Sequence, residues 1–154
     1  IPCSYAASIY PMDLYLYQYL VGNAEQSVSV TNRLKRMSHV EKVTEDLIRH
    51  YNAHPEFSNA AKEYIYKKTE GVILSYYVAG CIMNPDKKKG RKDCLRYNEM
   101  IRRLNPEFWN RVSRKFRIYR WMNRLGISFP VYETMLHSGL YNKLRHNQKI
   151  EAEK

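Results

Sequence analysis

One stretch of this chain limits the possible fold more than any other. Residues 72–83 are almost entirely apolar. These twelve residues are too few for a helix that crosses a bilayer. A helix that is apolar on every side is normally buried inside a larger protein. We therefore expect this stretch to lie in the central helix of a soluble helical bundle.

Apolar residues elsewhere in the chain recur at the three- and four-residue spacing of helices. The first predicted helix follows Ser29 and carries one apolar stripe, made of Val30, Leu34, Met37, Val40, Val43, Leu47 and Tyr51. Capping and helix-breaking residues separate four further helices. Pro55 and Ser58 precede the second helix, which runs to Ile82, and Asn105-Pro106 separates the third from the fourth. Gly126 ends the fourth helix, and Pro130 opens the fifth. We therefore predict a mainly α fold, a bundle of about five helices.

The first 28 residues have a different composition from the rest. Residues 14–21 alternate aromatic and apolar types and end at Gly22-Asn23, which predicts a short β-strand or hairpin segment. Because a two-stranded ribbon is marginal in water, this segment should complete a sheet elsewhere. The chain also begins Ile1-Pro2, without an initiator Met. We therefore expect a piece of a longer protein, in which residues 1–28 end a catalytic domain and residues 29–154 form a C-terminal helical domain.

The chain is strongly basic, with 26 Lys and Arg against 15 Asp and Glu and a formal net charge of +11. This excess favours anionic partners, namely nucleic acid, an acidic membrane surface or phosphorylated substrates. The cysteines Cys3, Cys81 and Cys94 form no C-x-x-C pattern and no even set. A disulfide scaffold is therefore not expected, and a reducing, cytoplasmic setting fits better.

Two short clusters are candidates for ligand binding. His50 and His54 are four residues apart near a predicted helix end, a spacing that can hold a metal. No third ligand is evident, and histidines near a helix C-terminus are also favoured by the helix dipole. The basic run 87–92 lacks the pattern of a phosphate loop. We interpret it as a charged loop or a frayed helix start, with contact to phosphate or lipid headgroups as the functional alternative.

The fourth predicted helix is basic and amphipathic. Its cations flank the apolar stripe, with Arg111, Arg114 and Lys115 on one side and Arg117, Arg120 and Arg124 on the other. Such a helix either lies on an anionic membrane or packs in a bundle while its long side chains extend to water. We favour the packed helix. Nucleic acid is disfavoured as a partner because no paired zinc ligands, RNP-like pattern or basic zipper is present.

Residues 7–22, which include Tyr-Leu-Tyr and end in Gly22, are followed by Gln26-Ser27-Val28. This pattern resembles the end of the catalytic domain of bacterial family 2 glycosyltransferases, where a Tyr-x-Tyr strand precedes a glycine loop, then Gln-Ser, then a helical tail. Residues 36–51 resemble that tail. The resemblance implies a parent enzyme that uses a nucleotide-sugar and a divalent metal in surface polysaccharide synthesis. No D-x-D motif is present in this chain. Such enzymes carry that motif and the carboxylate base in the part of the sequence that precedes this pattern.

The resemblance also sets the expectations for sites and partners. The fragment should lack the donor and metal site and be inactive alone, with no catalytic residue and no cofactor of its own. Gln26 and Ser27 are the candidates for polar substrate contact, the alternative being a turn that leads into a helix cap. Asn23 stands where relatives often have Arg, so phosphate binding by this loop is not assumed.

The expected partners are the chain's own upstream catalytic domain, an anionic membrane surface at the inner membrane, and other copies of the fragment. A small basic module that binds nucleic acid or a membrane surface is the alternative function.

Overall fold

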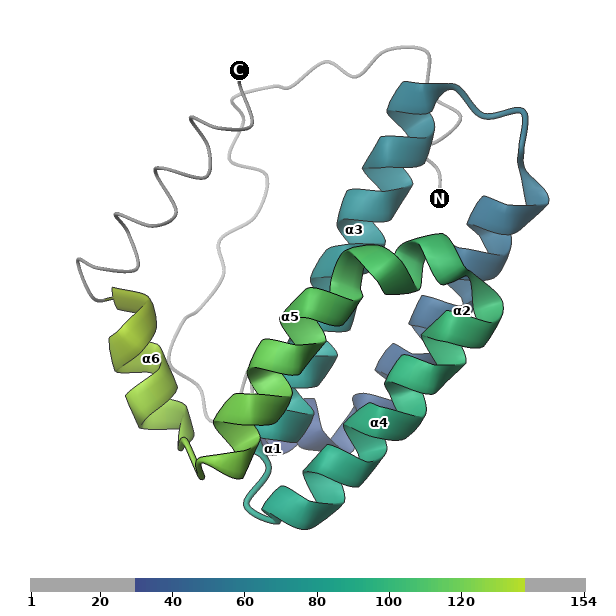
Figure 1. Ribbon diagram of the computed structural model, residues 1–154. Coiled ribbons are helices and arrows are strands. Elements are labelled where there is room, and N and C mark those ends of the chain that lie inside the picture. Colours follow the sequence, from purple (N-terminus) through teal and green to yellow (C-terminus); the bar gives the residue numbers. More distant parts are fainter. Residues whose placement is uncertain (1–29, 138–154) are drawn as a thin grey trace, which may run out of the picture.

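The computed structural model describes residues 30–137, and within this range it is mainly helical (Figure 1). The described range holds six α-helices and one π-helical segment: α1 (Val30–Lys35), α2 (Met37–Ala53), α3 (Asn59–Tyr77), η2 (Val78–Met83), α4 (Lys87–Leu104), α5 (Pro106–Arg124) and α6 (Phe129–His137). The prediction of a mainly α bundle is therefore confirmed. The predicted strand or hairpin over residues 1–28 lies outside the described residues.

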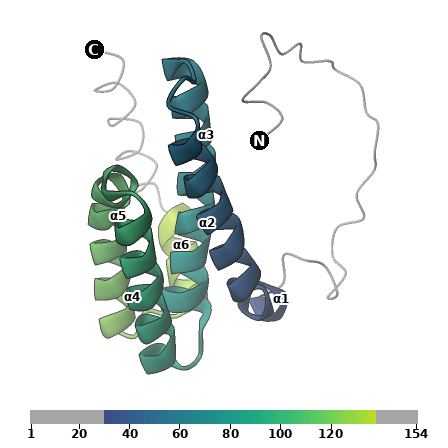
Figure 2. The ribbon, with the colours of Figure 1, turned by 90° about the vertical axis from the view of Figure 1, so that its right-hand side faces the viewer.

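Helices α2, α3, α4 and α5 form the body of the bundle. Helix α2 packs against α3 and α4, and α5 packs against the same two helices (Figures 1 and 2). Segment η2 is central, because it contacts α1, α3, α4, α5 and α6. The predicted central position of residues 72–83 is thus confirmed for the part that forms η2. No helix within residues 30–137 is long and apolar enough to cross a membrane.

Aromatic side chains fill much of the core. Tyr77 contacts the rings of Tyr97 and Phe116, and Tyr76 stacks on Tyr97 with ring centroids 3.9 Å apart. Phe108 meets Tyr51 edge to face. Large rings therefore link α2, α3, α4 and α5 in one apolar cluster, and such buried rings supply much of the hydrophobic stabilisation of a fold.

The predicted caps and breakers explain most helix ends. Ser58 caps α3 by accepting a hydrogen bond from the amide of Ala61, at 3.3 Å. Asn105 caps α5 in the same way, and Pro106 occupies its first turn. Gly126 follows α5 with a φ of +70°, a left-handed conformation that glycine adopts without strain.

The first predicted helix needs two corrections. It is divided at Arg36 into α1 and α2. Its buried positions are Thr44 and Ile48, whereas Val43 of the predicted stripe is 47% exposed. The apolar pattern did not identify Thr44 as a core residue because threonine is polar. Its hydroxyl forms hydrogen bonds inside the bundle, so it can be buried without a large cost in free energy.

The end of η2 meets the start of α4 at very short range. A Cβ placed on Gly90 would lie 2.0 Å from the carbonyl oxygen of Gly80, and one on Gly80 would lie 2.4 Å from Cys94 Sγ. Only glycine permits this approach of two backbones. Cys81 and Cys94 are both buried, and both are free thiols in the described part of the chain.

Of the two predictions for the run 87–92, the charged loop is wrong, whereas the position at a helix start is confirmed. The run forms the first turns of α4, and the Asp86 carboxylate caps them by accepting from the amide of Lys89 at 2.9 Å. The Lys87 ammonium donates to the carbonyl of Ile82 at 2.7 Å and to that of Ile127 at 3.1 Å. These bonds hold the end of η2 against the turn after α5, which gives this lysine a structural role.

Candidate functional site

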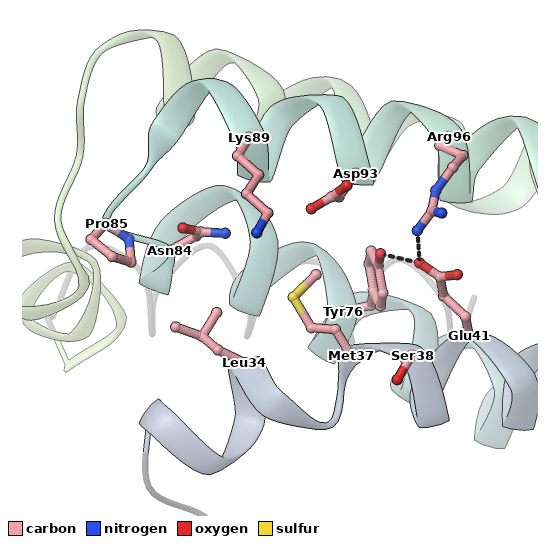
Figure 3. A pocket seen from close by; sticks show the side chains of 10 residues that line it. All are labelled: Leu34, Met37, Ser38, Glu41, Tyr76, Asn84, Pro85, Lys89, Asp93 and Arg96. Carbon is pink, nitrogen blue, oxygen red and sulfur yellow. Dashed lines mark hydrogen bonds and ion pairs between the residues drawn. The ribbon is translucent and has the colours of Figure 1, made fainter.

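The described part of the chain contains an open pocket of about 320 Å³ between α1, α2, α4 and the end of η2 (Figure 3). Its lining is mixed, with apolar side chains from α1 and α2 facing charged side chains from α4. The lining residues are Leu34, Met37, Ser38, Glu41, Tyr76, Asn84, Pro85, Lys89, Asp93 and Arg96. This is where ionisable groups from three separate helices converge, so we treat it as the candidate site.

Three of these residues form a fixed cluster at one end of the pocket. The Tyr76 phenol of α3 donates to Glu41 Oε1 of α2 at 2.5 Å, and the Arg96 guanidinium of α4 donates to the same oxygen at 2.6 Å (Figure 3). Hydrogen bonds to an ionised group are stronger than neutral ones. One carboxylate oxygen therefore ties three helices together.

A second bond lies directly behind this cluster. Thr44 Oγ1 lies 2.6 Å from the Tyr97 hydroxyl and also donates to the carbonyl of Val40 at 2.9 Å. Because Tyr97 stacks on Tyr76, the buried pair and the pocket cluster share one wall. The wall facing the pocket is therefore held by hydrogen bonds as well as by ring packing.

The electrostatics of the cluster argue against proton transfer near neutral pH. Burial, followed by the hydrogen bond to Glu41, raises the pKa of Tyr76 far above its ordinary value. The neighbouring Glu41 carboxylate raises the pKa of Arg96. Both groups thus keep their protons, whereas a general base needs a pKa near the working pH. The arrangement is suited to holding helices in place.

Lys89 and Asp93 complete the charged side of the pocket. Both side chains line it, and neither makes an ion pair with another residue in the described range (Figure 3). They lie one helical turn apart on α4, so the pocket offers one cation and one anion next to an apolar floor. It could accommodate a small polar molecule, but its geometry does not identify a reaction.

The predicted histidine pair is brought together. The ring centroids of His50 and His54 are 4.6 Å apart, and His54 stacks on Phe57. His54 Nδ1 also lies 2.7 Å from Glu56 Oε1. Burial, and then the nearby His54, lowers the pKa of His50. Within residues 30–137 no group of three His, Cys, Asp or Glu side chains is placed to hold a metal ion, so the pair carries no metal proposal.

The cations of α5 divide into two groups. Arg111 forms ion pairs with Glu63 of α3 and with Glu107, at 3.1 and 3.3 Å. Lys115 forms an ion pair with Glu70 of α3. The two cations nearest to α3 therefore fasten α5 to that helix. The arginines on the opposite side of the helix make no ion pair that involves the described residues.

The pocket cluster could not be found from local sequence signals. Glu41 is separated from Tyr76 by 35 positions and from Arg96 by 55, and each resembles an ordinary surface or core residue in its own helix. Gln26 and Ser27, the residues predicted for substrate contact, lie outside the described residues. Comparison of the chain with protein-family models, curated proteins and solved structures finds no match.

Proposed function

We propose that this chain is the C-terminal helical region of a bacterial family 2 glycosyltransferase. It would support a catalytic domain that transfers sugar from a nucleotide-sugar to an acceptor in surface polysaccharide synthesis. The observation that carries the proposal is the pattern over residues 7–51, namely the Tyr-x-Tyr segment, the glycine, Gln26-Ser27 and the tail.

The helix that contains most of that tail gives the proposal its structural support. Residues 37–53 form α2, in which Thr44 and Ile48 are completely buried and Glu41 bonds to α3 and α4. The tail and the helices that follow it therefore form one packed unit. A supporting domain needs such a rigid connection. A catalytic loop just before the tail is held in position by the helices on which the tail packs.

The proposed division of labour places the chemistry upstream. The donor, the divalent metal and the catalytic base would belong to the parent's nucleotide-sugar domain, and Gln26 and Ser27 would lie at the rim of its active site. The helical domain would hold this rim in place through α2. Sugar transfer by residues 1–154 alone is not part of the proposal.

The first test is the reading frame upstream of Ile1 in the gene. We expect it to encode a nucleotide-sugar-binding α/β domain with a D-x-D motif, and a frame without one would contradict the proposal.

The second test compares the full-length parent with the 154-residue chain in an assay of labelled sugar transfer. The parent should release nucleotide diphosphate and label an acceptor, whereas the chain alone should do neither. In the parent, Gln26→Ala should lower kcat/KM with little change in thermal stability. A parent that is equally active after this substitution would remove Gln26 from the site.

A further inference from the structure

The outward face of α5 carries an exposed apolar stripe. Ile118 and Trp121 of α5 and Leu125, the residue that caps its end, are 52%, 60% and 58% exposed, and their spacing of three and four residues places them on one side of the helix. Val112 and Phe116 point into the core from the opposite side. Helix α5 is therefore apolar on two faces, and packing within the bundle accounts for only one of them.

The same half of the helix is strongly basic. Residues 111–125 contain six Arg and Lys and no Asp or Glu. Two of these cations are ion-paired with α3, as described above. Arg114 lies on the stripe side one turn before Ile118, and Arg117 and Arg124, seven residues apart, lie along one edge of the stripe. All three are exposed and make no ion pair with any residue from 30 to 137.

This combination indicates what could cover the stripe. A contiguous patch of exposed apolar side chains, unlike single exposed residues, often marks a binding surface. Trp is favoured at the boundary between lipid and water, and arginines at the edge of an apolar face pair with anionic headgroups. Nucleic acid would use the arginines but would gain little from Ile118 and Leu125, since its backbone is charged.

We propose that the stripe of Ile118, Trp121 and Leu125, with Arg114, Arg117 and Arg124, binds the surface of an anionic lipid bilayer. Helix α5 then lies parallel to the bilayer plane, with the stripe in the headgroup layer and the opposite face still packed in the bundle. This inference rests on the described helices and is independent of the glycosyltransferase proposal.

The test is sedimentation of the chain with vesicles of phosphatidylglycerol and phosphatidylcholine in equal parts, compared with vesicles of phosphatidylcholine alone. We expect binding to the anionic vesicles only, and release by high salt. The variant Ile118→Gln/Trp121→Gln/Leu125→Gln should bind at least about tenfold more weakly. The variant Arg114→Gln/Arg117→Gln/Arg124→Gln should bind roughly a hundredfold more weakly, because each arginine contributes separately.

Matched substitutions elsewhere on the surface distinguish binding through the α5 face from binding through the overall positive charge of the chain. Lys42→Gln/Lys88→Gln/Lys92→Gln removes the same charge as the arginine variant, and Val43→Gln/Leu95→Gln removes exposed apolar side chains from α2 and α4. Both controls should keep most of the binding. Circular dichroism establishes that each variant is folded, so weaker binding cannot be ascribed to unfolding.

A fluorescence measurement locates the contact. The chain has two tryptophans, so Trp109→Phe leaves Trp121 as the only reporter. Its emission should shift to the blue with anionic vesicles and be quenched by brominated lipid. The proposal is overturned if the chain binds neutral vesicles equally well, binds neither, or loses as much binding in the lysine control. It is also overturned if the stripe variant binds vesicles as well as the unsubstituted chain does, while the arginine variant binds both vesicles and duplex DNA more weakly.

Discussion

Two regions of the molecule carry similar residue types in different surroundings. In the first, which we call the crossing, Glu41 and Thr44 of α2 meet Tyr76 of α3 and Arg96 and Tyr97 of α4. The second is the outer face of α5. At the crossing, Arg96 bonds to Glu41, and the Tyr97 hydroxyl lies in hydrogen-bonding distance of Thr44. On α5, Arg117 and Arg124 have no ion pair with the described residues, and Trp121 is 60% exposed. The polar groups at the crossing bond to each other, whereas these side chains of α5 are available to contact a partner outside the bundle.

The difference separates residues that stabilise the fold from residues available for function. The buried hydroxyls of Thr44 and Tyr97 are costly to disturb, because each would lose its partner without gaining water. Exposed side chains on α5 already contact water, so replacing them changes stability little. Substitutions at the two regions should therefore give effects of very different size.

The largest expected effect follows from alkaline pH, which acts on the buried tyrosines of α3 and α4 and not on the exposed side chains Ile118, Trp121 and Leu125. Burial is the main cause that raises the pKa of Tyr66, Tyr76, Tyr77 and Tyr97, in the case of Tyr66 from 10.0 to about 12. The neutral phenols contribute their full stability below pH 10, the ordinary tyrosine value, and lose it as the pH rises through the folded pKa. We expect cooperative unfolding to begin above about pH 10.

The measurement is circular dichroism together with tyrosinate absorbance over the same pH range. The tyrosinate absorbance contributed by these four buried residues should appear together with the loss of helix. If the buried tyrosines ionise near their ordinary pKa while the helices persist, the crossing is far more open to water than its burial indicates.

The next effect concerns the backbone contact beside the crossing. Gly90→Ala would place a methyl group 2.0 Å from the Gly80 carbonyl oxygen, and the backbone would have to move. We expect the free energy of unfolding to fall by about 3 kcal/mol or more. Gly71→Ala is the control, because nothing lies within 4 Å of its Cβ position and it should gain about 0.5–1 kcal/mol of helix stability. Urea unfolding measures both, and equal effects would contradict the close approach.

A smaller loss is expected from the buried hydroxyl pair. Thr44→Val leaves the Tyr97 hydroxyl without its partner and should cost about 1–3 kcal/mol. Tyr97→Phe should cost less, because Thr44 keeps its bond to the Val40 carbonyl. The double variant should be more stable than the sum of the two changes predicts, by about 1 kcal/mol. Strict additivity in the urea data would mean that the two hydroxyls do not interact.

The smallest effect on stability should come from α5. Each of Ile118→Gln, Trp121→Gln and Leu125→Gln should change the free energy of unfolding by less than about 0.5 kcal/mol. Measured by the same urea titration, these values complete the comparison between crossing and outer face. A loss of 2 kcal/mol or more from any one of them would show that the stripe is packed against the chain itself.

Local signals in the sequence predicted the helix ends well. Ser58, Asn105-Pro106 and Gly126 act through their own hydroxyl, amide or backbone conformation, so each can be recognised without knowledge of its neighbours in space. The apolar stretch likewise indicated a central helix, and η2 is nearly completely buried.

Features that depend on distant partners were not predictable in this way. The buried position of Thr44 depends on Tyr97, and the pocket cluster depends on residues 35 and 55 positions from Glu41. The sequence left the run 87–92 undecided between a loop and a helix start, because the bonds of Lys87 to two carbonyls give no pattern in the sequence. Gln26 and Ser27 stay predictions, since they lie outside the described residues.

The π-helical turn of η2 has a consequence for how this chain tolerates changes in length. The amide of Asn84 bonds to the carbonyl of Ala79, five residues earlier, so the segment holds more residues per turn than an α-helix. Deleting one residue between Val78 and Met83 would remove the extra residue of the wide turn and restore ordinary α-helical winding, so α3 would keep nearly the same rotation relative to α4. Deleting one residue in the middle of α3 would instead rotate the residues before it by about 100° and carry their buried tyrosines out of the core, so among related chains a one-residue difference should fall in η2 rather than in α3.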